Sequence, residues 1–284
     1  MRYRFMRYPG GKKKAVTLSY DDGVRADKRL AELLTANEMK GTFNVNTGMW
    51  QGEGKLSPDE LQKYILDAGH EIAVHGHRHI APGAGIPAVV VGDVLDCRRA
   101  LEEAFGCIIR GMAYPDSGVT KMHNENTYPE IRSLLQSLGI VYARSLAGDN
   151  DKFMLPTDFL CWVPTAHHNN PHLFEWVEKF NAIEEGGYAA AAYPRLFYLW
   201  GHSYEFDKDD NWHVIERFCR EIGGREDTWY PTNIELYEYA QAYNSLVCSA
   251  DGNRIYNPTL HTVWISTDGK STWAIAPGET LVIY

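Results

Sequence analysis

Residues 15–23 read Ala15-Val16-Thr17-Leu18-Ser19-Tyr20-Asp21-Asp22-Gly23. Residues 15–20 form a short apolar run of the kind found in buried β-strands, and the run stops at two carboxylates and a glycine. A helical pattern follows, with leucines at positions 30, 33 and 34 on one face. The stretch therefore predicts the first unit of a fold built from repeated β-α units.

The same alternation of strand and helix continues to about residue 243. Further strands are predicted at 42–45, 71–74, 107–113, 140–143 and 196–200, and helices near 89–105, 128–138, 174–183, 214–222 and 234–243. About seven strands, each followed by a helix, favour a (β/α) barrel of the TIM type, distorted or incomplete, over an open parallel sheet, which stays the alternative. In either architecture the loops at the carboxyl ends of the strands build the active site.

Beyond about residue 245 the alternation of strand and helix patterns gives way to short β-rich segments. Two short β-rich pieces, 262–266 and 272–275, are joined through Asp268-Gly269, a hairpin turn signal. About forty residues are few for an independent core, so we expect a β extension packed on the barrel. The predicted division is a catalytic barrel over 1–244 and a C-terminal β-strand extension over 245–284.

The composition restricts the class of partner. With 28 basic and 37 acidic side chains, the net charge of -9 disfavours binding to nucleic acid or anionic membranes. The first nine residues mix charge with aromatics and do not resemble a signal peptide or membrane span, so we expect a cytoplasmic protein. Five scattered cysteines without a CxxC pair predict buried thiols in a reducing compartment. A small-molecule or oligosaccharide substrate fits this profile, and the oligomeric state is not predicted.

Three predicted strand ends carry clusters of polar residues: Asp21-Asp22-Gly23, His75-Gly76-His77-Arg78-His79 and Gly201-His202. The two carboxylates of the first cluster could bind a metal and take a proton, but this cluster alone is explained better by a turn with a helix cap. The second places two imidazoles four residues apart, which lets both reach one ion. His77 is expected to point away from them, as a structural residue.

Asp22, His75 and His79 are the inferred metal ligands. Two histidines and a carboxylate leave coordination positions open for water and substrate, as in a catalytic rather than a structural site. One divalent ion is therefore predicted as the cofactor. Zn²⁺ is the first choice because hydrolysis needs no redox chemistry, although Co²⁺, Ni²⁺, Mn²⁺ or Fe²⁺ would accept the same ligands.

The clusters, in this order, resemble the motifs of the polysaccharide deacetylases of carbohydrate esterase family 4. The family's first motif is matched by residues 18–23, and its His-(Ser/Thr)-x-x-His motif by His75 and His79, with Gly76 in place of the hydroxyl residue. The third is similar to residues 110–115, and a Leu-x-x-His motif is matched by Leu199 and His202. The fourth, an Asp/Trp segment that walls the site, has no clean match; residues 158–162 lie where it is expected.

The resemblance implies roles for the matched residues. Asp21 would be the general base, oriented and kept ionised by Arg110. The backbone N–H of Tyr114 would stabilise the oxyanion. His202, beside a carboxylate that the sequence does not identify, would protonate the departing amine. The residues expected to contact substrate are Trp162, Trp200, Leu199 and His168, with His167 as a further candidate.

The expected function is a metal-dependent hydrolase that removes acetyl groups from N-acetylated sugars or oligosaccharides, in carbohydrate metabolism. The first alternative is another carbon-nitrogen hydrolase, allantoinase-like or acting on cyclic imides, or an O-deacetylase on the same scaffold. An alternative of another class is a non-catalytic carbohydrate-binding protein that uses Trp50, Trp162, Trp200 and Tyr204 as stacking platforms. Asp21 and His202 argue against it, because a pure binder needs neither a base nor an acid.

Overall fold

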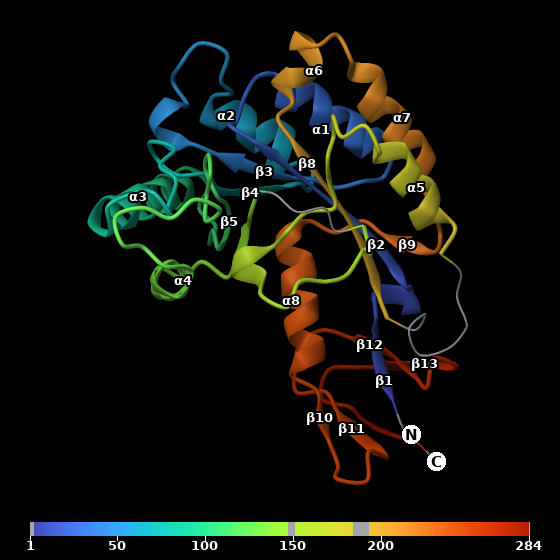
Figure 1. Cartoon of the computed structure of the whole chain (residues 1–284). Coiled ribbons are helices and arrows are strands. Elements are labelled where there is room, and N and C mark those ends of the chain that lie inside the picture. Colours follow the sequence, from blue (N-terminus) through green and yellow to red (C-terminus); the bar gives the residue numbers. More distant parts are fainter. Residues whose placement is uncertain (1–2, 147–150, 184–192, 284) are drawn as a thin grey trace.

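A curled parallel sheet forms the centre of the molecule (Figure 1). The computed structural model describes residues 3–146, 151–183 and 193–283. In this sheet the strands follow the order β6-β5-β4-β3-β2-β8-β7, and β9 pairs with the first two residues of β2. The strands are β2 (Lys14–Asp21), β3 (Thr42–Val45), β4 (Glu71–Val74), β5 (Gly111–Ala113), β6 (Tyr142–Arg144), β7 (Ala166–His167), β8 (Arg195–Gly201) and β9 (Thr228–Trp229).

The two edges of this sheet are drawn together by residues 162–167. Trp162 forms a parallel bridge with Arg144 beside β6, and its N–H donates to Ala143 O at 3.0 Å. A few residues on, the Thr165 N–H donates to Tyr198 O, and β7 then pairs with β8. The sheet therefore curls into an incomplete barrel. This confirms the predicted TIM-like architecture and excludes the open sheet.

Helices follow the strands and cover the outer face of the curled sheet (Figure 1). They are α1 (Ala26–Ala36), α2 (Pro58–Leu61), α3 (Pro87–Phe105), α4 (Tyr128–Ser137), α5 (Leu173–Asn181), α6 (Tyr204–Lys208) and α7 (Trp212–Ile222), whereas α8 (Asn233–Asn244) has a different position, described below. Ser57 and Glu60 form a capping box at the start of α2. The strand predicted from 107 is shorter than expected, since only 111–113 pair and Ile108 is exposed.

Side chains along each strand point alternately to the two faces of the sheet, and each face packs into its own hydrophobic core. Alternate residues of β2, among them Leu18, pack with Leu30 and other helix residues in the main core. Side chains on the inner face of the sheet, such as Tyr142 and Tyr198, pack instead with Leu236 of α8. Helix α8 thus closes the amino-terminal end of the barrel. The carboxyl ends of the strands stay free for the polar side chains.

Two small antiparallel sheets form the extension below the barrel (Figure 1). One has the order β1-β12-β13 and the other β10-β11-β14. Their bounds are β1 (Arg4–Arg7), β10 (Val247–Cys248), β11 (Arg254–Tyr256), β12 (Val263–Thr267), β13 (Ser271–Ile275) and β14 (Thr280–Val282). The hairpin predicted at Asp268-Gly269 is confirmed, and both residues have the positive φ, 52° and 69°, that a tight hairpin turn needs.

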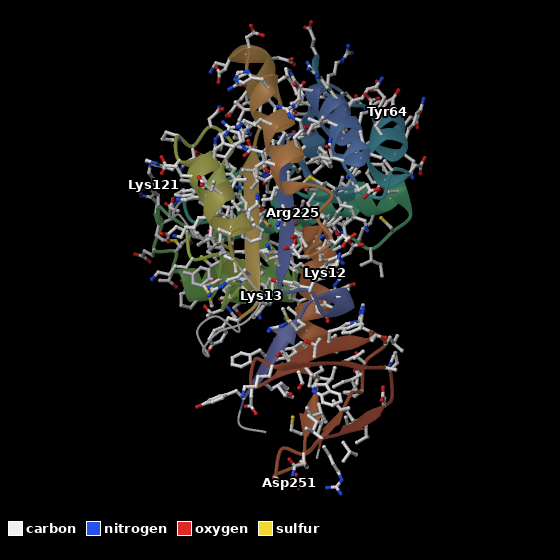
Figure 2. The ribbon with its side chains drawn as sticks, turned by 90° about the vertical axis from the view of Figure 1, so that its right-hand side faces the viewer. Lys12, Lys13, Tyr64, Lys121, Arg225 and Asp251 are labelled. Atoms are coloured by element: carbon white, nitrogen blue, oxygen red, sulfur yellow. The ribbon has the colours of Figure 1, made fainter. Side chains whose placement is uncertain are left out.

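The N-terminal strand β1 belongs to the sheet of the extension. It pairs antiparallel with β12 from Arg4↔Thr267 to Arg7↔Trp264. A small core that includes Ala242 and Leu246 joins the extension to the end of α8. Figure 2 shows Asp251 at the far tip of the extension and Lys12 and Lys13 near its junction with the barrel. The division at residue 244 stays a prediction.

Two sequence expectations concern the surroundings of the chain. No helix in the described ranges is both long and apolar enough to cross a membrane. The expectation of buried thiols is confirmed for Cys97 and Cys219. It is wrong for Cys107 and Cys248, which are exposed because they lie in the loop after α3 and in a strand at the surface of the extension.

Candidate active site

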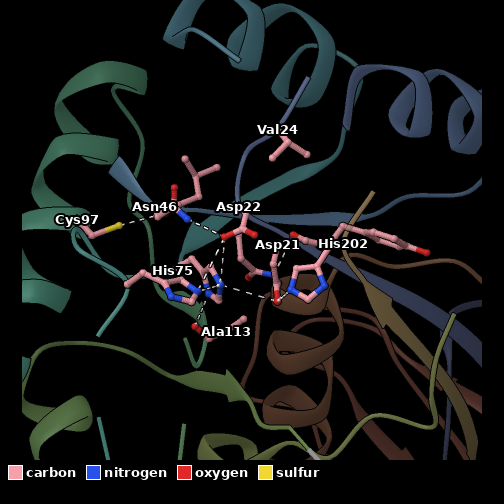
Figure 3. A network of polar contacts seen from close by, with 12 residues as sticks. Asp21, Asp22, Val24, Asn46, His75, Cys97, Ala113 and His202 are labelled. Carbon is pink, nitrogen blue, oxygen red and sulfur yellow. Dashed lines mark hydrogen bonds and ion pairs between the residues drawn. The ribbon is translucent and has the colours of Figure 1, made fainter. Parts of the chain in front are cut away.

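Four strands bring polar side chains together at the carboxyl end of the barrel, and Figure 3 shows Asp21, His75 and His202 of this group. Asp21 ends β2, His75 directly follows β4, Arg144 ends β6 and His202 directly follows β8. On β2 the inward row runs through alternate residues to Asp21, and the turn then changes direction at Asp22, whose φ of 84° is unusual for a residue with a side chain. Both carboxylates therefore face the same cluster.

The predicted ligands Asp22, His75 and His79 lie together. His75 Nε2 is 3.1 Å from His79 Nε2, and Asp22 Oδ1 is 3.8 and 3.9 Å from these two atoms. A point equidistant from the three atoms lies about 2 Å from each, the length of a bond from zinc to nitrogen or oxygen. These three residues can therefore hold one divalent ion.

The hydrogen bonds of the ligands also suit a metal. His75 Nδ1 lies 3.0 Å from Ala113 O, so this nitrogen carries the proton and Nε2 presents its lone pair. Burial lowers the pKa of His75, which favours the neutral form that binds metals. The Asn46 amide donates to Asp22 Oδ1 at 2.7 Å and fixes that carboxylate. His77 turns away, as expected, to contact Thr47 Oγ1 at 2.9 Å.

Asp21 is buried among nitrogen-bearing side chains. It forms an ion pair with the buried Arg144, accepts a hydrogen bond from the Asn44 amide at 2.9 Å, and lies 3.8 Å from His75 Nε2. Burial by itself would raise the pKa of Asp21, but Arg144, His75 and His202 outweigh it and lower the pKa. Asp21 is thus held as a carboxylate beside the inferred metal ligands.

The predicted contact between Arg110 and Asp21 is wrong. Arg110 precedes β5, at the amino-terminal end of the barrel, and pairs with Glu238 of α8 at 3.2 Å. Arg144 takes the expected position because it ends β6 at the carboxyl edge. A guanidinium is still present beside the carboxylate, but it comes from the next strand.

Glu205 is the carboxylate partner of His202. His202 Nδ1 lies 3.0 Å from Glu205 Oε1, and its Nε2 faces Asp21 Oδ2 at 3.9 Å. Burial would lower the pKa of His202, but the hydrogen bond that it donates to Glu205 and the nearby charge of Asp21 raise it. His202 is therefore favoured as a proton donor that points toward Asp21.

Two further imidazoles and an amide lie close to Glu205. His168 Nε2 lies 3.0 Å and His167 Nε2 3.3 Å from Glu205 Oε2, and the Asn169 amide donates to the same oxygen at 3.2 Å. Burial alone would raise the pKa of Glu205, but the nearby His168 imidazole and the hydrogen bond donated by His202 lower it well below its usual range. The stretch 167–169 thus holds Glu205 ionised.

By spacing alone, His167, His168 and Glu205 form a second group that could hold a cation. The hydrogen bonds favour a different interpretation. The Asn169 backbone N–H donates to His167 Nδ1 at 3.1 Å, so the ring proton of neutral His167 is on Nε2, which faces Glu205. A metal at Nε2 would have to displace that proton and leave the Nδ1 acceptor in place. We therefore assign His167 and His168 to the electrostatic environment of Glu205 rather than to a second metal site.

The backbone N–H of Tyr114 does not lie free for an oxyanion. It donates to Arg144 O at 3.0 Å, which extends the pairing between β5 and β6. The phenol is buried and donates to Leu160 O at 2.7 Å. The expected role of Tyr114 as an oxyanion donor is therefore wrong in this conformation, because the sheet already uses the group.

The four residues expected to contact substrate have different positions. Trp162 is fully buried against Tyr142 and Tyr198 inside the barrel, and Leu199 is fully buried in the main core because its side chain points to the helices. His168 is buried behind Glu205. Substrate contact by these three is wrong for this structure.

Trp200 differs from the other three because it is partly exposed at the site. The Arg144 guanidinium lies 4.3 Å from the centre of its ring, and the His167 ring packs on it edge to face. Substrate contact by Trp200 stays a prediction. Alternation along β8 explains the difference from Leu199, since neighbouring residues on a strand point to opposite faces.

Sequence reasoning missed Asn44, Asn46, Arg144 and the role of Glu205. Signals were present for them. Asn44 and Asn46 surround the end of the second predicted strand, Arg144 follows the strand predicted at 140–143, and Glu205 is three residues after His202. A search for polar residues at every strand end would have selected them.

The family model described as "Polysaccharide deacetylase" matches residues 4–142, about half of the chain. A putative polysaccharide deacetylase from Mycobacterium smegmatis is structurally similar, with a TM-score of 0.57 and 18% identity over 86% of this chain and 96% of that one. The Puue allantoinase matches with a TM-score of 0.58 and 16% identity, over 81% of this chain and 91% of that one.

The Streptococcus pyogenes deacetylase PplD is a looser match, with a TM-score of 0.43 and 18% identity. The alignment covers 48% of this chain and 58% of PplD. No curated protein matches the chain significantly. The structural likenesses concern the fold alone. By the family match over its first half, the chain belongs to the polysaccharide deacetylase family.

Proposed function

We propose that this protein is a metal-dependent hydrolase that removes acetyl groups from N-acetylated sugars or oligosaccharides and releases acetate. One observation carries the proposal: the ionised Asp21 lies beside the Asp22, His75 and His79 cluster on one side and His202 on the other. A base, an acid and three metal ligands thus meet at one strand edge. A binding protein would need neither the base nor the acid.

The residues divide the chemistry of amide hydrolysis among them. A divalent ion held by Asp22, His75 and His79, with Zn²⁺ as our first choice, would polarise the acetyl carbonyl and lower the pKa of a bound water. Asp21 accepts the proton of the water that attacks the carbonyl carbon. Arg144 keeps Asp21 ionised before this transfer and holds its carboxylate in place.

Cleavage of the carbon-nitrogen bond needs a proton on the leaving nitrogen. His202 supplies it from Nε2, the ring nitrogen that faces Asp21, while Nδ1 stays hydrogen-bonded to Glu205. The negative Glu205 stabilises the charged imidazolium before the transfer. The products are acetic acid, which ionises to acetate, and a free amine; the cycle closes when Asp21 releases the proton it took from water and His202 takes up a proton again.

A second candidate is another carbon-nitrogen hydrolase on the same scaffold. The family's fourth motif is expected near residues 158–162, but Trp162 in this segment is buried. The stretch 166–169 follows it, and His168 in this stretch contacts Glu205. Those residues shape one wall of the site, so the substrate can differ while the acid, the base and the metal ligands stay the same. Assays with an allantoin-type amide and with O-acetylated sugars address this candidate.

Acetate release from short N-acetylglucosamine oligomers tests the proposal. We expect activity that a chelator abolishes and Zn²⁺ or Co²⁺ restores, and a loss on the order of 10²–10⁴-fold in Asp21→Asn. Asp116→Asn, an exposed acid after β5, is the control and should retain activity. Activity that ignores both the chelator and the Asp21 substitution would overturn the mechanism, and metal binding without acetate release would favour the second candidate.

A further inference from the structure

We propose that Asp93, on helix α3, is a positioning residue that holds the His75–His79 loop in its ligand-binding conformation. The inference rests on the metal site of the proposed function and concerns a residue outside that site. Asp93 is 1% exposed and carries a carboxylate in the helix layer behind the loop. Its surroundings account for that burial.

Asp93 accepts three backbone N–H groups from the loop. Its Oδ1 accepts from Arg78 N at 2.5 Å, its Oδ2 from Ile80 N at 3.2 Å, and its backbone carbonyl from His77 N at 3.0 Å. The Arg78 side chain also approaches Oδ1, with its Nε at 3.8 Å, but is 60% exposed. One helix residue therefore accepts hydrogen bonds from most of the backbone N–H groups in the loop that separates the two histidines.

The loop needs this support because its backbone is unusual. Gly76 has a φ of 73° and His79 a φ of 61°, so the second ligand histidine occupies a left-handed conformation that a residue with a side chain rarely adopts. The flanking N–H groups of Arg78 and Ile80 are bound to Asp93 on either side of His79. Fixing both neighbours fixes the direction in which the His79 ring leaves the chain.

Gly76 and Asp93 fit each other. A Cβ placed on Gly76 would clash with Asp93 Oδ2, so the carboxylate occupies the space that a side chain at 76 would need. This is the position at which the matched motif carries Ser or Thr. In this chain the loop is thus anchored by a carboxylate from α3, and Gly76 leaves room for it.

The first test measures metal affinity apart from folding. The metal-free protein is titrated with Zn²⁺, and its melting temperature is recorded without metal. Asp93→Asn keeps the shape of the side chain but leaves it with one acceptor oxygen instead of two. We expect this variant to bind Zn²⁺ about 10–100-fold more weakly. Asp96→Asn, an exposed acid on the same helix, should bind Zn²⁺ like the wild type. The visible spectrum of the Co²⁺ form reports whether the ligand geometry changes.

A second pair of variants leaves Asp93 itself unchanged, and one of the two pushes its carboxylate out of position. Gly76→Ala should weaken Zn²⁺ binding by forcing the carboxylate out of position. Gly69→Ala is matched to it, because Gly69 also has a positive φ, 83°, but a Cβ there would meet nothing within 4 Å. We expect Gly69→Ala to affect only the melting temperature, so the difference between the two isolates the contact with Asp93.

The outcomes separate this inference from the proposed function. Wild-type Zn²⁺ affinity and an unchanged Co²⁺ spectrum in both Asp93→Asn and Gly76→Ala would overturn the role of Asp93, whatever their melting temperatures. Should Asp93→Asn fail to fold, Gly76→Ala against Gly69→Ala decides the same point. A wild-type protein that binds neither Zn²⁺ nor Co²⁺ would instead overturn the metal site itself.

Discussion

At the scale of single residues, the Asp21 and Glu205 carboxylates are held ionised by different means. Asp21 relies on a full positive charge, the buried Arg144 guanidinium. Glu205 relies on hydrogen bonds from the His202 imidazole and the Asn169 amide and on the two nearby imidazoles of His167 and His168. His202 lies between the two carboxylates and contacts both. Its proton affinity therefore depends on both carboxylates, and Glu205 is the one that can be changed without removing the base.

We expect Glu205→Gln to shift the alkaline limb of the pH–rate profile to lower pH. Glu205 raises the pKa of His202, so His202 stays protonated to higher pH in the wild type and loses its proton earlier in the variant. The maximal kcat should also fall, by about ten-fold or more. Profiles of kcat against pH measure both effects.

Asp207→Asn serves as the control for this change. Asp207 lies on the same helix and bonds to Trp212 Nε1 at 2.7 Å, away from His202. An alkaline limb that stays in place in Glu205→Gln would show that Glu205 does not set the protonation of His202.

At the scale of elements, the sequence predicted the positions of the strands better than it predicted which of their side chains are buried. Apolar runs and glycine turns located β2, β3, β4 and β8, and polar residues at their ends pointed to the site. The direction of Leu199 and the burial of Trp162 were not predictable, because they depend on how far the sheet curls. Arg110 and Arg144 lie at opposite ends of neighbouring strands, which a motif match over residues 110–115 could not distinguish.

The two tryptophans give a test at this scale. Trp162→Ala should lower the free energy of unfolding by about 3–5 kcal/mol, because it opens a cavity among Tyr142, Tyr198 and Phe159. Trp200→Ala should leave stability nearly unchanged and raise KM, since its ring is partly exposed beside Arg144. Urea unfolding and steady-state kinetics check the pair; a KM effect larger for Trp162→Ala than for Trp200→Ala would contradict these placements.

At the scale of the whole molecule, the chain forms a barrel with its site at one end and an extension at the other (Figure 1). The length and the late β-rich composition predicted this extension, and the hairpin at Asp268-Gly269 was visible in the sequence. The contribution of β1 was not, because a four-residue strand near the N-terminus has no partner signal of its own. Pairing over such a separation depends on the folded barrel.

Removal of residues 1–8 is expected to destabilise the extension. Phe5 and Met6 are buried, and β12 would lose the antiparallel partner on one side and expose an edge. We expect faster proteolysis within 245–284 and a greater tendency to aggregate, with Zn²⁺ binding retained because the site lies at the far end of the barrel. Limited proteolysis and light scattering measure these effects. An extension as resistant as that of the full chain would contradict the structural role of β1.

The pairing of β1 with β12 also bears on biosynthesis. Arg4 meets Thr267, so β1 is synthesised long before β12, the strand with which it pairs. At ordinary rates of translation the delay is on the order of tens of seconds, long enough for domains to begin folding as the chain emerges. Until β12 is synthesised, Phe5 and Met6 have no sheet to join, so their apolar side chains stay exposed and available to chaperones.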